Sequence, residues 1–331
     1  MTVVYVKTIN KLIYSMALLG WKNVSYHYVF LEPQNFSNAE QKFKEECVII
    51  GKIENALKIT ISVLGPFFYD TFDKKKNEKY PIELNQIKIE PRAHITSNLI
   101  KPLKLDKKNH GHTILFEGAS TLRYVNQKST LRYWVNRLLQ KNSHLYSYEG
   151  IVLPDSPSDL VKPFDKKNGI SVVHHSVLKK NFEIIGDLLG LRPFMSDIAH
   201  VTSVLLAPSE LSVAEKLKYI EGIIRKNPKE VFLLKVHPHE AYFLNDLDYQ
   251  NVVALPEQLN YLPFEFFVAN VSRKLKYFGY YSSVMLFFET KSLTLVEPKN
   301  RRIRKIYKRE YWSYMKLIKR DLSTLKEGAV E

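Results

Sequence analysis

Short apolar runs alternate along the first half of the chain with segments whose apolar residues recur at helical spacing. Residues 3–6 form a run of β-branched and aromatic residues, which predicts a strand, and residues 9–19 have the spacing of a helix. A strand followed by a helix is how an α/β domain begins. By the same criteria we expect strands at residues 24–31, 47–50 and 113–116, a charged loop at 70–79 and a helix at 130–139.

The second half of the chain repeats this alternation. Strands that alternate with helices of about ten residues predict parallel sheets in both halves. Two such domains facing each other would leave a cleft between the carboxyl ends of their strands, where open α/β sheets bind ligands. In this half we expect strands at residues 203–206, 231–236, 252–255, 277–279 and 293–296, and helices at 214–225 and 262–269.

A polar, lysine-rich break at residues 163–169 predicts a boundary between two domains. The length of 331 residues, of which 45% are hydrophobic, is enough for two buried cores. The expected fold class is therefore α/β, with two Rossmann-like domains. We expect an N-terminal domain at 1–165, a linker with a connecting helix at 166–200, a C-terminal domain at 201–300 and a basic helical segment at 301–331.

Composition indicates which cellular compartment and which class of partner to expect. The single cysteine, Cys47, cannot form an internal disulfide, which is typical of a reducing, cytoplasmic setting. Apolar stretches fall short of the roughly 20 residues needed to cross a bilayer, and the first residues lack a signal-peptide pattern. The formal net charge of +15 indicates an anionic partner, which could be nucleic acid, acidic lipid or an acidic polysaccharide.

The sequence Lys-Val-His-Pro at residues 235–238 follows an apolar run at 231–234. A histidine at the carboxyl end of a buried parallel strand points into the ligand crevice, where its imidazole can donate a hydrogen bond to a phosphate oxygen. The alternative is a strand-end histidine whose hydrogen bonds go to the backbone. His237 and His239 lack a third ligand at metal-site spacing, so we expect no metal.

Glu117 and Gly118 follow another expected strand, at residues 113–116. Glycine lets a substrate approach the backbone closely, and a glutamate that faces a cleft is a candidate general base for a sugar hydroxyl. The alternative is an exposed turn residue.

Ser282 and Ser283 follow the strand expected at residues 277–279. At a strand-to-helix junction, their hydroxyls and backbone N–H groups could bind a phosphate, although ordinary helix caps have the same pattern. Ser209 follows another strand of this half, and Glu265 stands at an expected helix start. Because these loops follow successive strands of one domain, a single nucleotide could contact all of them.

Taken in order, these motifs resemble those of the bacterial sialyltransferases and polysialyltransferases of the GT-B type. That family carries an acidic-Gly motif in its N-terminal domain, then His-Pro and Ser-Ser/Thr motifs in its C-terminal domain. Here Glu117-Gly118, His237-Pro238 and Ser282-Ser283 are similar to them, and residues 262–266 are similar to the Pro-x-Glu helix of the family. The family often has two consecutive acids before the glycine, whereas Phe116 stands first here.

The resemblance implies two Rossmann-like domains facing across a cleft, and an inverting, metal-independent transfer of sialic acid from CMP-sialic acid. Glu117 would be the general base, and His237 would meet the charge that builds on the leaving phosphate. Ser282 and Ser283 would hold phosphate oxygens, and Glu265 would accept hydrogen bonds from the ribose. The expected donor-binding set is Ser209, Lys235, Pro238, Glu265, Ser282 and Ser283.

The excess of positive charge favours a polysialyltransferase that elongates a capsular polysialic acid chain, because each residue of that polymer carries a carboxylate. A basic groove in the N-terminal half would hold the growing chain. Its candidate residues are Lys74, Lys75, Lys76, Lys101, Lys104 and Arg123.

Other functions remain open. A lipooligosaccharide sialyltransferase of the same fold would add a single residue, and another enzyme of this kind would use a different CMP-activated acidic sugar. The basic, aromatic segment at residues 301–320 also suits a nucleic-acid-binding protein, although that would leave Glu117 and His237 unexplained. The same segment could instead contact anionic lipid on the inner face of the membrane, near a capsule export machine.

Overall fold

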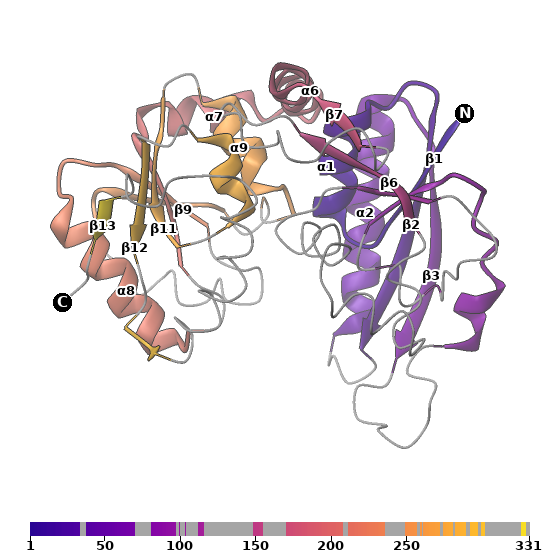
Figure 1. Cartoon of the computed structure of the whole chain (residues 1–331), viewed down its shortest axis with the longest axis horizontal. Helices are drawn as coiled ribbons and strands as arrows, with labels where there is room; N and C mark the ends of the chain where they lie inside the picture. The colour runs from indigo at the N-terminus through magenta and orange to yellow at the C-terminus, as the bar shows by residue number, and fades with distance from the viewer. Residues whose placement is uncertain are drawn as a thin grey trace. The chain divides into compact units, whose positions relative to one another are not determined.

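The computed structural model describes two compact α/β units (Figure 1). Unit 1 takes its described residues from 1–154 and 170–181, and unit 2 takes its own from 182–328. The structure describes residues 1–33, 38–69, 81–96, 99, 103, 112–115, 148–154, 170–207, 211–235, 249–256, 259, 261–271, 274–280, 282–288, 292–296, 299–301 and 326–328.

Unit 1 contains a seven-stranded sheet in the order β3-β2-β1-β4-β5-β6-β7, and every neighbouring pair is parallel. From β1 the chain first adds strands on one side and then returns to add β4 on the other, as in a doubly wound sheet. The strands are β1 (Thr2–Val6), β2 (Val24–Pro33), β3 (Ile61–Tyr69), β4 (His94–Thr96), β5 (His112–Leu115), β6 (Tyr148–Pro154) and β7 (Ile170–Val173).

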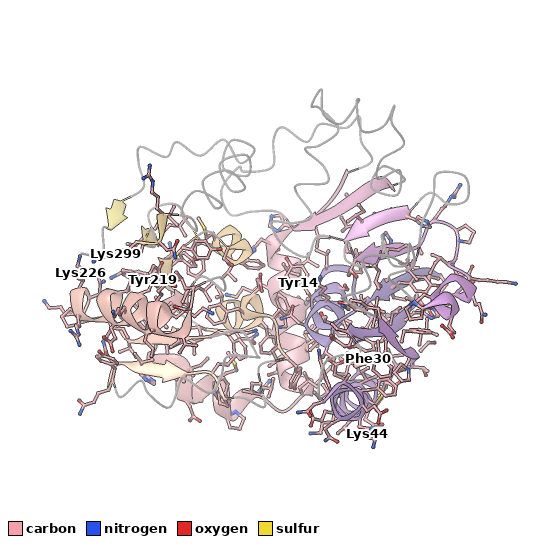
Figure 2. All side chains as sticks on the ribbon, turned by 90° about the horizontal axis from the view of Figure 1, so that it is seen from below. Tyr14, Phe30, Lys44, Tyr219, Lys226 and Lys299 are labelled. Atoms are coloured by element: carbon pink, nitrogen blue, oxygen red, sulfur yellow. The ribbon has the colours of Figure 1, made fainter. Side chains whose placement is uncertain are left out.

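Helices α1 (Ile9–Leu19) and α2 (Ala39–Leu57) pack against strands β1 to β3 (Figure 1). The Thr8 side chain caps α1, and the hydroxyl of Tyr26 on β2 donates to the Gly20 carbonyl just beyond the helix, at 2.5 Å. Phe30 lies buried between α2 and the sheet, whereas Lys44 points outward from α2 (Figure 2). The short 3₁₀ helix η1 (Ile82–Gln86) follows β3.

Residues 47–50 lie inside α2, so our expectation of a strand there was wrong. The buried side chains of α2 include Ile50, Ile53 and Leu57, which recur at helical spacing, while Val48 is 60% exposed. A run of four apolar residues therefore does not override a helical period that extends over the whole segment.

Unit 2 contains a six-stranded sheet in the order β10-β9-β8-β11-β12-β13, again parallel throughout. Its strand order follows the same doubly wound scheme as that of unit 1, with β8 in the place of β1 and β11 in the place of β4. The strands are β8 (Ser203–Leu206), β9 (Phe232–Leu234), β10 (Val252–Ala254), β11 (Lys276–Gly279), β12 (Leu293–Val296) and β13 (Lys326–Gly328).

Helix α8 supplies much of the core of unit 2. Ser212 and Glu215 form a capping box at its start, and its apolar face packs with strand residues such as Phe232 and Phe278. The buried hydroxyl of Tyr219 on this helix (labelled in Figure 2) donates to the Val296 carbonyl at 2.8 Å. From residue 175 onward the described helices are α6 (His175–Leu188), α7 (Arg192–Asp197), η4 (Ile198–His200), α8 (Val213–Lys226), α9 (Phe264–Asn270) and η7 (Ser283–Phe287). Among the helices that the structure describes, none is both long and apolar enough to cross a membrane.

Two segments differ from the expected domain plan. Residues 170–173, which we placed in the linker, form the edge strand β7, because their apolar and β-branched side chains suit pairing with β6. Residues 326–328, which we placed in a helical segment, form β13 beside β12. Helix α6 contributes to both units: Asn181 donates to the Ala17 carbonyl in unit 1 at 2.8 Å, and Phe182 packs edge-on against Phe266 in unit 2.

Candidate functional site

The carboxyl edge of the unit 2 sheet is the natural place for a ligand. From β8 the chain proceeds to β9 and β10 on one side, and β11 begins the strands on the other side. Loops that leave β8 and β11 therefore diverge, and in doubly wound sheets this divergence creates the ligand crevice. The residues that follow β8, β9 and β11 are those in which we expected the donor site.

Gly279 brings the carboxyl ends of β8 and β11 close together. It pairs with Leu206 and has a φ of +149°, which side chains rarely permit. A Cβ atom at this position would lie 2.5 Å from the Leu206 carbonyl oxygen. The backbone therefore requires a glycine at the point where the two loops separate. Sequence reasoning gave this glycine no role, although its position at a strand end just before Tyr-Tyr-Ser-Ser was visible.

Ser282 follows β11 and caps the 3₁₀ helix η7. Its Oγ accepts a hydrogen bond from the Val284 backbone N–H at 3.5 Å, so the serine has at least the structural role that we considered as the alternative. Its hydroxyl can also donate to an acceptor such as a phosphate oxygen. The backbone of Ser283 begins η7, while its side chain lies outside what the structure describes.

A hydrogen bond from Lys235 connects the end of β9 to the turn that precedes α9, the helix of Glu265. Lys235 follows this strand directly, and its Nζ donates to the Leu262 carbonyl at 2.5 Å. Burial of the ammonium group lowers the pKa of Lys235 to about 8, although the nearby Glu265 carboxylate opposes this shift. Glu265 belongs to the first turn of α9 and is only 8% exposed.

The three described residues of the expected donor site belong to elements that contact one another. Lys235 joins the end of β9 to the turn before α9, and α9 packs against η7, which Ser282 caps. The structure thus places an ammonium and a carboxylate near the start of α9, and a hydroxyl at the start of η7, which packs against α9. A carboxylate can accept hydrogen bonds from sugar hydroxyls, and the other two groups can donate to anionic oxygens.

The remaining predicted site residues lie outside the described residues, but the strands that lead to two of them are described. Strand β5 ends at Leu115, two residues before Glu117, and β9 ends at Leu234, three residues before His237. Both strands were expected, and both are confirmed as members of parallel sheets. The residues outside the described part of the chain are Glu117, His237, Ser209, Pro238, Lys74, Lys75, Lys76, Lys101, Lys104 and Arg123.

The carboxyl edge of the unit 1 sheet carries a charged cluster that sequence reasoning missed. Lys7 directly follows β1, and Glu32 stands near the end of β2. Lys42 and Glu46 come from the first turns of α2. Lys42 Nζ lies 2.5 Å from Glu32 Oε1, and the Tyr28 hydroxyl donates to Glu46. We call the residues Lys7, Glu32, Lys42 and Glu46 the charged cluster of unit 1.

Burial shifts the pKa values of two members of this cluster in opposite directions. It lowers the pKa of Lys7, an effect that Glu32 partly opposes. It raises the pKa of Glu46, against the hydrogen bond from Tyr28. Lys7 Nζ also lies 5.9 Å from the centroid of the Tyr69 ring. In each case burial disfavours the charged form, as expected for groups withdrawn from water.

Within the described residues, no group of three or more histidine, cysteine, aspartate or glutamate side chains could hold a metal ion. The expectation of a metal-independent reaction stays a prediction, since His237 lies outside this set.

No protein-family model matches the chain, and no curated protein matches it. What the protein does is therefore inferred from its own residues and from the geometry of its two sheets.

Proposed function

We propose that the protein is an inverting, metal-independent glycosyltransferase of the GT-B type that transfers sialic acid from CMP-sialic acid to an anionic sugar acceptor. One observation carries this proposal. The unit 2 sheet has the strand order of nucleotide-binding folds, and Lys235, Glu265 and Ser282 gather at the carboxyl edge of that sheet. These groups match the hydroxyls and the phosphate of a nucleotide.

Each part of the donor has a partner of suitable chemistry in this proposal. The Glu265 carboxylate accepts hydrogen bonds from the ribose hydroxyls, and Ser282 donates to a phosphate oxygen. His237, which follows β9 closely, donates to the leaving phosphate as negative charge builds on it. Glu117, which follows β5, removes the proton of the acceptor hydroxyl.

The charge of the chain favours a polymeric acceptor. Its formal net charge is +15, and a polysialic acid chain carries one negative charge per residue. We therefore favour a polysialyltransferase that works at the cytoplasmic face of the membrane, where its basic C-terminal segment contacts anionic lipid. A lipooligosaccharide enzyme that adds one residue is the second candidate, because the donor site would be the same.

The decisive experiment incubates the full chain with CMP-sialic acid and a short, labelled oligosialic acid, and then measures product length. We expect products longer by several residues, whereas extension by one residue would identify the second candidate. Glu117→Gln and His237→Ala should each slow transfer by about a hundred-fold or more. Absence of transfer, together with absence of CMP binding by calorimetry, would refute the proposal.

A further inference from the structure

Lys235 makes a contact that is unusual for a lysine expected to bind a ligand. Its Nζ donates to the backbone carbonyl of Leu262 at 2.5 Å. Leu262 is completely buried and precedes Pro263, the N-cap residue of α9. The lysine therefore connects the end of β9 to the entry of the helix that carries Glu265.

The backbone bonds around this turn connect residues that are close in sequence or in the sheet. The Leu255 N–H donates to the Leu234 carbonyl at 3.0 Å, which extends the pairing of β9 and β10 by one step. Further along the chain, the Leu262 N–H donates to the Leu259 carbonyl at 3.0 Å, within the turn that precedes α9. The bond from Lys235, in contrast, joins the turn directly to the end of β9, an inner strand of the sheet.

Burying an ammonium group is costly unless it is hydrogen-bonded and faces an opposite charge. Lys235 has both compensations: the Leu262 carbonyl accepts a hydrogen bond from its ammonium group, and the Glu265 carboxylate attracts its charge. Glu265 is itself only 8% exposed, and its carboxylate lies near enough to Lys235 to act on the charge of the lysine. Lys235 is thus bonded to the turn that leads into α9, and its charge is attracted by the Glu265 carboxylate in the first turn of that helix.

We infer that Lys235 is a positioning residue: it fixes Glu265 for hydrogen bonding to the ribose hydroxyls of the nucleotide and does not itself contact the phosphate. This inference rests on the proposed nucleotide-sugar function and changes the role expected for Lys235. Recognition of the ribose then depends on a protonated lysine, because only the ammonium form both donates to Leu262 and attracts Glu265.

A pH dependence follows from this geometry. Lys235 loses its proton as the pH rises through its pKa of about 8, and among the described residues Glu265 is the charged group that acts on it. The affinity for CMP should fall above pH 8, when the attraction that positions Glu265 is lost. The CMP phosphate itself is already doubly ionised there, since the second pKa of a phosphate monoester is about 6.

The experiment compares the binding of CMP and of 2′,3′-dideoxy-CMP, which lacks the ribose hydroxyls, by calorimetry at pH 7 and pH 9. The variants are Lys235→Met, Lys235→Arg, Glu265→Gln and the double variant K235M/E265Q. Lys218→Met on the exposed face of α8 is the matched control for the loss of one lysine.

We expect Lys235→Met and Glu265→Gln each to weaken CMP binding by about ten-fold or more, as for the loss of a hydrogen bond to a charged group. The double variant should be little worse than either single variant, because both disrupt one unit. Dideoxy-CMP should bind all variants almost equally, and Lys235→Arg should restore part of the affinity. The wild type should prefer CMP over dideoxy-CMP less strongly at pH 9 than at pH 7.

The outcomes separate this inference from the proposed function. If the wild type binds CMP but Lys235→Met weakens CMP and dideoxy-CMP equally, the lysine contacts the phosphate and the positioning role is refuted. If the wild type does not bind CMP at all, both the proposed function and the inference fail. Should Lys235→Met not fold, the pH dependence of the wild type and the behaviour of Lys235→Arg still decide the question.

Discussion

The carboxyl edges of the two sheets share one strand order but differ in their chemistry. In unit 1, the charged cluster is largely balanced within the protein, since Lys42 pairs with Glu32 and Tyr28 binds Glu46. In unit 2, Lys235 and Glu265 are organised around the start of a helix. The same fold therefore carries a cluster of paired charged residues at the carboxyl edge of one unit and, in the proposed function, a nucleotide site at the carboxyl edge of the other.

From this contrast we expect substitutions in the two units to affect different properties, folding stability in one case and nucleotide binding in the other. Substituting a charged residue that is paired with another inside unit 1 should change the pH dependence of the free energy of unfolding. Groups at the carboxyl edge of unit 2 should alter nucleotide affinity. Substitutions at Gly279, Glu230 and Glu46 test this division, in order of decreasing expected effect.

Gly279→Ala should have the largest effect, because it changes the backbone at the point where β8 and β11 separate. Its new Cβ would lie 2.5 Å from the Leu206 carbonyl oxygen, at a φ of +149°. We expect a loss of roughly 2–4 kcal/mol of stability, together with weaker CMP binding. Chemical denaturation and calorimetry would measure the two effects.

Gly51→Ala in α2 is the matched control for this change. A Cβ at Gly51 would meet no atom within 4 Å, and the residue lies within a helix, where alanine is favoured by up to about 1 kcal/mol. The same substitution should therefore stabilise unit 1 and leave CMP binding unchanged. Equal effects at both positions would mean that the close approach at Gly279 is not a constraint.

Glu230→Gln tests whether a carboxylate at the opposite, amino edge of unit 2 is purely structural. Glu230 Oε2 accepts hydrogen bonds from Thr202 at 2.8 Å and Ser203 at 2.7 Å, and Glu230 also pairs with Lys276. Burial acts to raise the pKa of Glu230, but these partners outweigh burial and leave the pKa below its ordinary value. We expect a loss of about 1–3 kcal/mol at neutral pH and no change in CMP affinity.

The sign of the pH dependence follows from that lowered pKa. The stabilisation from Glu230 is present above the pKa of the unfolded chain and is lost as the pH falls through the lower, folded-state pKa. Denaturation of the wild type between pH 7 and pH 3 should therefore show a decline that Glu230→Gln lacks in part. Weaker CMP binding by Glu230→Gln would contradict this expectation, because it would link the amino edge of unit 2 to nucleotide binding.

Glu46→Gln should have the smallest effect, and it probes the charged cluster of unit 1. Burial raises the pKa of Glu46, so its contribution to stability is present at low pH and is lost as the pH rises from about 4.5 through the folded-state pKa. Glutamine keeps an oxygen that can accept the Tyr28 hydrogen bond. We expect a gain of about 1 kcal/mol or less at pH 8, with a flatter pH profile in denaturation experiments. A loss of transfer activity would instead assign Glu46 to the reaction.

Much of the regular structure could be predicted from local patterns. Helix α1 and strands β8 and β12 have the expected bounds, because short runs with clear periodicity determine them. Strand β3 was missed because Gly65 and Pro66 interrupt it and are typical of a turn. The run at 47–50 by itself resembles a strand, and only the helical period of the surrounding residues shows that it belongs to α2.

The candidate site was predictable only where a residue directly follows a strand or begins a helix. Lys235 and Glu265 were found in this way, at the end of β9 and the start of α9. The role of Gly279 depends on its pairing with Leu206, more than seventy residues away, and local sequence cannot show which strands become neighbours. The charged cluster of unit 1 likewise combines a residue that follows β1 with residues of β2 and α2, which only the folded chain brings together.

Strand β13 gives the second sheet an outer border only three residues long. Without it, β12 would present a row of unpaired backbone N–H and C=O groups, which are a ready template for pairing with another chain. Shortening the protein before Lys326 would therefore promote aggregation, even though these three residues lie three strands away from β8 in the sheet order.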